Sequence, residues 1–77
     1  MRVVLYSRPG CHLCDVARDV VLSERTRTTF VFEEVDIDGD DDLVREYGIR
    51  IPVVAVNGED RFDYEVDPGE FARLVRG

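Results

Sequence analysis

The chain has few basic residues, few cysteines and no long apolar run. Its 10 basic residues, all arginine, stand against 17 Asp and Glu, which gives a net charge of −7. Because a nucleic-acid partner needs Lys and Arg to neutralise its phosphates, this charge argues against nucleic-acid binding. No apolar stretch approaches the roughly 20 residues that a membrane-spanning helix needs. The sequence therefore predicts neither a nucleic-acid partner nor a membrane anchor.

The small size of the chain bounds its organisation. We expect one domain, covering residues 1–77, with a small core, because a chain of this length hides only about 60% of its extended surface on folding. An apolar content of 44% and a charged content of 35% are typical of a folded globular protein. No cleavable apolar segment precedes the first predicted strand, so we expect a cytoplasmic location. We also expect the protein to be a monomer.

The two cysteines and the single histidine fall in one motif, Cys11-His12-Leu13-Cys14. A bridge between cysteines three positions apart closes a tiny loop and removes little entropy from the unfolded chain, which disfavours a purely structural disulfide. A closed zinc site needs four ligands, and on a helix His12 faces away from the cysteines, so only a dimer could complete such a site. Redox chemistry is therefore the favoured interpretation, and metal or cluster binding is the alternative.

Apolar periodicity and turn residues predict an α/β fold with the element order β-α-β-α-β-β-α. Strands are predicted over residues 3–6, 29–36, 53–56 and 59–64, and helices over residues 11–23, from the acidic run 38–42 to Gly48, and from Pro68 onward. The polar stretch 24–28 is the expected link between the first helix and the second strand. A crossover of this length makes the first two strands parallel, and Asn57-Gly58 is a strong hairpin signal. The strands should form a four-stranded mixed sheet.

Capping residues support the two later helices. The acids of residues 38–42 supply an N-cap for the short helix, and Gly48 ends it, followed by Ile49, the apolar residue that often accompanies such a cap. Asp67 is the expected N-cap of the last helix, and Glu70 would close a capping box with it.

The cysteine motif stands where a strand passes into a helix. At a helix N-terminus the unpaired N–H groups and the helix dipole favour negative charge, such as a thiolate on Cys11. In this setting the pKa of a cysteine falls from about 8.5 into the range of roughly 3.5–7.5. We therefore expect Cys11 to attack a disulfide and Cys14, one turn into the helix, to resolve the mixed disulfide.

This architecture is similar to the thioredoxin fold, with C-x-x-C at the start of the first helix and a proline before the third strand. The segments 6–14 and 51–59 resemble the glutaredoxin-like proteins of that superfamily, and the resemblance covers nearly the whole chain. It implies a small thiol–disulfide oxidoreductase with a Cys11–Cys14 dithiol, no resident cofactor, and glutathione as a possible co-substrate. Its partners would be disulfide-containing or thiolated proteins and a thiol or reductase that donates electrons. The alternatives are a thioredoxin-like electron donor to one protein partner, and an iron–sulfur or metal carrier using Cys11 from two chains.

The resemblance also implies roles for residues around the cysteines. A basic residue at the place of Arg8 stabilises the thiolate in glutaredoxins, and His12, as an imidazolium, would do the same. For each of the two, the alternative is an ordinary surface residue. The proline matching Pro52 is cis in the thioredoxin fold and faces the cysteines, so that the backbone of Ile51 pairs with the substrate. The simpler alternative for Pro52 is that it only starts a strand.

One part of the chain departs from the glutaredoxin pattern. Glutaredoxins carry a Gly-Gly pair followed by an acid, which lets the backbone approach glutathione. Here the region 62–67 holds bulky and acidic residues, with Tyr64 and Glu65 at the place of the small ones, although Asp67 matches the family's acid as a substrate-binding residue. We therefore expect glutathione to bind weakly.

Overall fold

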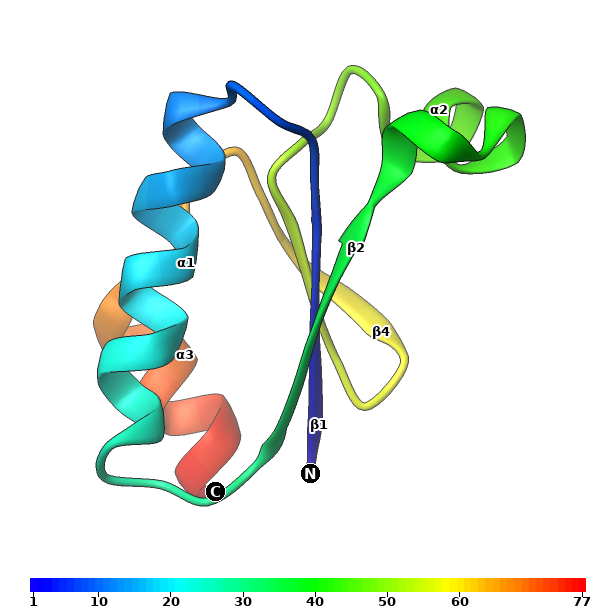
Figure 1. Cartoon of the computed structure of the whole chain (residues 1–77). Helices are drawn as coiled ribbons and strands as arrows, with labels where there is room; N and C mark the ends of the chain where they lie inside the picture. The colour runs from blue at the N-terminus through cyan, green and yellow to red at the C-terminus, as the bar shows by residue number, and fades with distance from the viewer.

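The computed structural model describes residues 1–77 and contains the seven predicted elements in the predicted order (Figure 1). They are β1 (Arg2–Ser7), α1 (His12–Arg25), β2 (Val31–Asp36), α2 (Asp41–Tyr47), β3 (Val53–Val56), β4 (Glu59–Asp63) and α3 (Pro68–Arg76). A short 3-10 turn, η1 (Ile37–Gly39), was not predicted. None of the helices combines the length and the apolar character needed to cross a membrane.

The four strands form one mixed sheet in the order β2-β1-β3-β4. Strand β1 is parallel to β2 and antiparallel to β3, and β3 is antiparallel to β4. The hairpin between β3 and β4 turns on Asn57 and Gly58, whose φ angles of 52° and 86° fit a two-residue hairpin loop. Asn57 is also bound to the start of β1, because its Oδ1 accepts the N–H of Arg2 at 2.9 Å. The predicted α/β class and mixed sheet are confirmed.

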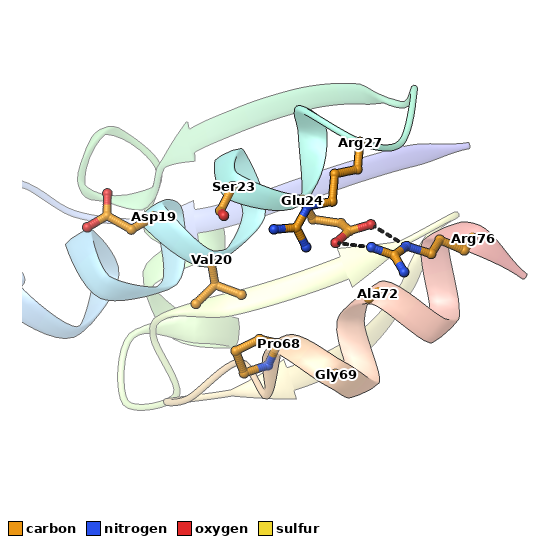
Figure 2. Close-up of a pocket in the computed structure, with 9 residues that line it drawn as sticks. All are labelled: Asp19, Val20, Ser23, Glu24, Arg27, Pro68, Gly69, Ala72 and Arg76. Atoms are coloured by element: carbon orange, nitrogen blue, oxygen red, sulfur yellow. Dashed lines mark hydrogen bonds and ion pairs between the residues drawn. The ribbon is translucent and has the colours of Figure 1, made fainter.

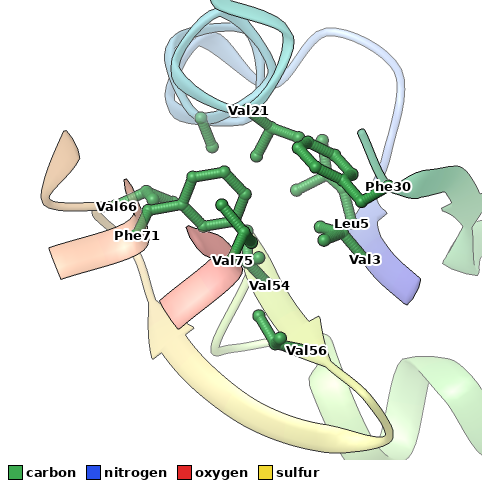
Figure 3. Packing of buried hydrophobic residues seen from close by; sticks show 10 residues of the cluster. Val3, Leu5, Val21, Phe30, Val54, Val56, Val66, Phe71 and Val75 are labelled. Atoms are coloured by element: carbon green, nitrogen blue, oxygen red, sulfur yellow. The ribbon is translucent and has the colours of Figure 1, made fainter. Parts of the chain in front are cut away.

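Helices α1 and α3 lie together on one face of the sheet, and α2 lies on the other side (Figure 1). The core between α1, α3 and the sheet is apolar; Leu5, Val21 and Val54 have no exposed surface, and Phe71 meets Phe30 edge to face with ring centroids 5.9 Å apart (Figure 3). Burying a side chain of this size contributes about 1.5–3 kcal/mol. This packing fixes the direction of α1 relative to β1, and therefore the position of the cysteine motif between them.

The helix caps follow the sequence in part. Asp40 caps α2 and Asp67 caps α3 through their Oδ1 atoms. Gly48 ends α2 as predicted but has a right-handed φ of −54°, and it is glycine because a Cβ there would collide with the carbonyl oxygen of Val44. Ile49 does not pack on the helix end; it is 87% exposed.

Candidate functional site

The two cysteines lie at the junction between β1 and α1 and are joined by a disulfide, with their Cα atoms 5.2 Å apart. Cys11 is the N-cap of α1, and its Sγ accepts a hydrogen bond from the backbone N–H of Cys14 at 3.1 Å. Cys14 has no exposed surface, whereas Cys11 is half-buried. The two sulfur atoms therefore have different surroundings, one near solvent at the helix end and one beneath it.

Local sequence explains this placement. Gly10 has a φ of 77°, which glycine adopts readily, and this turn brings the chain from β1 to the start of α1. Ala17 and Val21 follow Cys14 on the buried face of the helix and are 2% and 0% exposed. Because residues three to four positions apart share a helix face, the core holds Cys14 inside. Cys11, outside that face, keeps its access to solvent.

The two residues proposed to stabilise a thiolate lie on either side of Cys11. Arg8, in the loop before it, is half-buried and donates its Nε–H to Oδ1 of Asp38 at 2.9 Å, so its guanidinium is shared with a carboxylate of η1. His12 is the first residue of α1 and is exposed.

A polar network that the sequence did not reveal joins β1, β2 and α1 next to this loop. Ser7, only 3% exposed, donates its hydroxyl to Oε2 of Glu34 at 2.7 Å. Arg18 binds the same carboxylate through Nε and Nη2 and binds Asp15 through Nη1. The hydrogen bond from Arg18, aided by that from Ser7, lowers the pKa of Glu34. The alternation of side chains along β2 could have indicated this network, because it places Glu34 on the same face of the sheet as Phe32, toward α1.

The loop before β3 carries the cis peptide bond between Ile51 and Pro52, as the resemblance implies. Since Val53 pairs with Tyr6, this loop lies at the same end of the sheet as the cysteine motif. Pro52 is buried and Ile51 is half-buried. The carbonyl oxygen of Pro52 accepts the backbone N–H of Tyr64 at 2.8 Å. This hydrogen bond joins the loop before β3 to the segment after β4.

Tyr64 and Asp67 occupy the segment where the sequence departs from glutaredoxins. Tyr64 has a φ of 69°, a left-handed conformation that is uncommon for residues other than glycine. Its hydroxyl donates to the carbonyl oxygen of Ile49 at 2.8 Å. Asp67 is exposed and uses Oδ1 to accept the N–H of Glu70 at 3.0 Å. Tyr64, a bulky residue, therefore adopts the backbone angle that a glycine would favour at this place.

The largest cavity, about 570 Å³, lies away from the cysteines, between the second half of α1 and helix α3 (Figure 2). The predicted polar link at residues 24–28 is wrong here, because α1 continues to Arg25 and Glu24 is only 6% exposed. Glu24 accepts hydrogen bonds from Nε and Nη2 of Arg76 and from the hydroxyl of Thr28. These partners, Arg76 first, lower the pKa of Glu24. The cavity contains an ion pair that joins two helices, and neither cysteine lines it.

No three His, Cys, Asp or Glu side chains gather as a set of metal ligands in the structure. The cysteine pair is the reactive group of the chain, and two thiols at this separation can form and break a disulfide, since Cα distances of 4.4–6.8 Å are usual for disulfides.

Solved structures similar to this chain include two small bacterial proteins. Protein Ne2328 from Nitrosomonas europaea is 32% identical with a TM-score of 0.81, over 96% of this chain and 89% of that one. Protein XcR50 from X. campestris is 31% identical with a TM-score of 0.77, over 96% and 95% of the two chains. A mutant thioredoxin from Halobacterium salinarum, 21% identical with a TM-score of 0.67 over 97% and 71%, shares the fold. No curated protein sequence matches the chain.

The sequence itself matches a family model over residues 2–75, nearly the whole chain; the model describes a glutaredoxin-like domain (DUF836). The thioredoxin fold, this match and the pairing of Cys11 with Cys14 support a thiol–disulfide redox role. On these grounds the chain belongs to the glutaredoxin-like family of the thioredoxin superfamily.

Proposed function

We propose that the protein is a cytoplasmic thiol–disulfide oxidoreductase that reduces disulfides of protein substrates through a Cys11–Cys14 dithiol. The observation that carries this proposal is the helix-capping position of Cys11, whose Sγ accepts the N–H of Cys14. The same N–H and the dipole of α1 favour a negative charge on that sulfur when the disulfide is reduced. Cys14 lies beneath it, within reach for the second step.

The reaction takes place in two exchange steps. The Cys11 thiolate attacks one sulfur of the substrate disulfide; a Cys11–substrate disulfide forms, the substrate S–S bond breaks, and the other substrate sulfur leaves as a thiolate that takes up a proton. Cys14 then loses its proton and attacks the Cys11 sulfur. The substrate leaves as a dithiol, having gained two electrons and two protons, and the Cys11–Cys14 disulfide remains to be reduced by an external donor.

A donor other than glutathione fits the surroundings of the site better. Tyr64 fills the segment where glutaredoxins have small residues, and its side chain is bound to Ile49. Glu65 next to it is exposed and acidic. Glutathione carries a net negative charge, and like charges lower affinity and the rate of encounter. We therefore propose that the Cys11–Cys14 disulfide is reduced, in the manner of thioredoxin, by a reductase or by a thiol other than glutathione.

Coupled assays test both parts of the proposal. The protein is supplied with NADPH and a protein disulfide, and with either glutathione plus glutathione reductase or a thioredoxin reductase. We expect turnover with the thioredoxin reductase and slow turnover with glutathione. Cys11→Ser is the control that should be inactive in both assays. Saturable glutathione-dependent turnover at the level of an ordinary glutaredoxin would overturn the choice of donor, and absence of any disulfide reduction by the fully reduced protein would overturn the function.

A further inference from the structure

The cavity between the second half of α1 and helix α3 lies apart from the cysteine motif and has a volume of about 570 Å³. This volume falls in the range of roughly 300–1,000 Å³ that is usual for small-molecule sites. The wall on the α1 side consists of side chains at helical spacing, namely Asp19, Val20, Ser23, Glu24 and Arg27. The start of α3 forms the opposite wall (Figure 2). The cavity is therefore a candidate for a second site, with a chemistry of its own.

Two charged side chains of this cavity take part in no ion pair within the protein. They are Asp19 and Arg27, and both are exposed. Two turns of helix separate the two residues, which is roughly 11 Å along the helix axis. In Figure 2, Asp19 lies at one end of the cavity, and Arg27 extends toward Glu24 nearer the other end. The cavity therefore carries an unbalanced negative charge at one end and an unbalanced positive charge toward the other.

The ion pair between Glu24 and Arg76 leaves the positive charge of Arg27 available to a ligand. Glu24 is only 6% exposed and accepts hydrogen bonds from Nε and Nη2 of Arg76 at 2.7 and 3.1 Å. Arg76 chiefly lowers the pKa of Glu24, and the nearby charge of Arg27 contributes. Two guanidinium groups therefore lie beside one carboxylate. A second carboxylate, supplied by a ligand, would balance the charges, and a guanidinium binds a carboxylate through two parallel hydrogen bonds.

Apolar side chains border the middle of the cavity. Val20 projects from α1, and Pro68 and Ala72 lie across from it on α3 (Figure 2). Val20 and Ala72 are half-buried, so each presents part of its apolar surface to the cavity. A ligand that fits all three parts of the cavity therefore has an apolar body between a cationic end and an anionic end.

We propose that this cavity binds a short peptide with free termini and an apolar side chain between them. The carboxylate of the peptide pairs with Arg27, its ammonium group pairs with Asp19, and its apolar side chain lies against Val20. A tripeptide has the matching length, because three extended residues span about 10 Å. The net charge of −7 repels a simple anion at long range but not a zwitterion, whose net charge is zero. This site does not depend on the dithiol.

Four matched peptides test the inference in titrations followed by the amide chemical shifts of the protein, which give both the Kd and the location of binding. Ala-Leu-Ala has both charges and an apolar side chain. Its N-acetylated form lacks the ammonium group, its C-terminal amide lacks the carboxylate, and Ala-Ser-Ala lacks the apolar side chain. Ala-Leu-Ala should bind saturably and shift the amides of the second half of α1 and of α3.

Each missing group should weaken binding by a characteristic factor. Loss of either charge should raise the Kd about two- to fivefold, as for an exposed ion pair, and these two effects should diminish with added salt. Serine in place of leucine should raise the Kd roughly tenfold, the effect of burying one aliphatic side chain.

Substitutions in the cavity should remove one preference each. Arg27→Gln should bind Ala-Leu-Ala and its C-terminal amide equally, and Asp19→Asn should bind Ala-Leu-Ala and its N-acetylated form equally. The matched controls are Arg25→Gln, at an exposed arginine outside the cavity, and Asp41→Asn, at an exposed acid of α2. Both controls should keep the two charge preferences.

Four outcomes would overturn the inference. Equal affinities for the four peptides, or no saturable binding of Ala-Leu-Ala at millimolar concentration, would show that the cavity is not a peptide site. Tighter binding of the N-acetylated peptide than of the free one would indicate a site for simple anions. Charge preferences that persist in both Arg27→Gln and Asp19→Asn would place the binding site elsewhere. A Cys11→Ser protein should bind Ala-Leu-Ala as the wild type does, whatever the fate of the proposed function.

Discussion

The hydroxyl of Tyr64 donates a hydrogen bond to the carbonyl oxygen of Ile49, with 2.8 Å between the two oxygens. The backbone N–H of Tyr64 also donates to the carbonyl oxygen of Pro52. One residue after β4 therefore holds both ends of the loop that leads into β3. A left-handed φ in a residue other than glycine costs about 1–3 kcal/mol, and these two bonds offset that cost.

Tyr64→Phe should lower the free energy of unfolding by about 0.5–1 kcal/mol, the net contribution of one hydrogen bond. The variant keeps the aromatic ring, so it removes only the hydrogen bond to Ile49. Urea unfolding measures the stability, and amide exchange at residue 64 measures the loosening of the loop. Wild-type values of both would show that the hydroxyl does not brace the loop.

Asn57→Ala should destabilise the protein by about 1–2 kcal/mol, because it removes the bond to the N–H of Arg2 and places alanine at a φ of 52°. Asn57→Gly loses only the side-chain bond and should cost less. Since the hairpin tip pairs with the start of β1, at the end of the sheet away from the cysteines, both variants should keep wild-type alkylation rates at Cys11. Urea unfolding measures the loss of stability, and iodoacetamide kinetics measure the alkylation rate of Cys11. Slower alkylation of Cys11 in either variant would show that the hairpin tip affects the cysteine site.

The Glu24–Arg76 pair should make stability depend on pH. The pKa of Glu24 is lowered in the folded protein, chiefly by Arg76. Its contribution is therefore fully present above the ordinary glutamate pKa of 4.5 and is lost as the pH falls through the lower folded pKa. Glu24→Gln should lower Tm at pH 7, and the difference from wild type should shrink as the pH falls below 4.5 and through the lowered pKa of Glu24.

A matched control for this pair is Glu70→Gln, which removes an exposed partner of Arg73 within α3. Exposed pairs contribute little, so this variant should stay near the wild-type Tm at both pH values. A Tm difference for Glu24→Gln that stays constant from neutral to acid pH would show that the charge of Glu24 is not what stabilises the helix pair.

Substitutions at the Arg8–Asp38 pair should shift the pKa of Cys11 in opposite directions. Arg8→Ala removes a positive charge from the loop before Cys11 and should raise that pKa, whereas Asp38→Asn releases Arg8 from its ion pair and should lower it. The alkylation rate of Cys11 as a function of pH measures both pKa shifts. Because the two side chains are 34% and 49% exposed, the shifts should be small and should diminish in high salt. Shifts of the same sign would contradict a role for Arg8 near the thiolate.

Much of the fold could be read from local signals. The strand β1, the turn at residues 57–58 and the cap at Asp67 each depend on neighbouring residues. Strand β1 extends one residue beyond the predicted range at each end, and the turn and the cap lie where they were predicted. The start of α1 at the cysteine motif followed from the same kind of signal.

Features that depend on contacts between distant residues were not predictable. From the sequence, Glu24 was predicted to lie in a polar link. Its partner Arg76 is 52 residues further along the chain, so no neighbouring residue indicates the ion pair that buries it. The partners of Glu34 come from β1 and α1, which only the assembled sheet brings together. At Tyr64 the sequence revealed the missing glycine pair, but not that a tyrosine would adopt a glycine-like φ and hold the neighbouring loop.

The chemistry of the two cysteines should differ as much as their surroundings. Cys11→Ser should abolish disulfide reduction, because no attacking sulfur remains. Cys14→Ser should still attack but should hold its partner as a mixed disulfide on Cys11, which mass spectrometry would detect. Such trapping would identify the physiological partner directly.

The most direct measurement is the alkylation rate of each thiol against pH in the fully reduced protein. Cys11 should titrate well below the free-thiol value of about 8.5, while buried Cys14 should react slowly at every pH. If both thiols instead titrate together near 8.5, and the two serine variants are equally inert, the pair is not a redox dithiol; iron or zinc content after anaerobic purification would then be the quantity to measure.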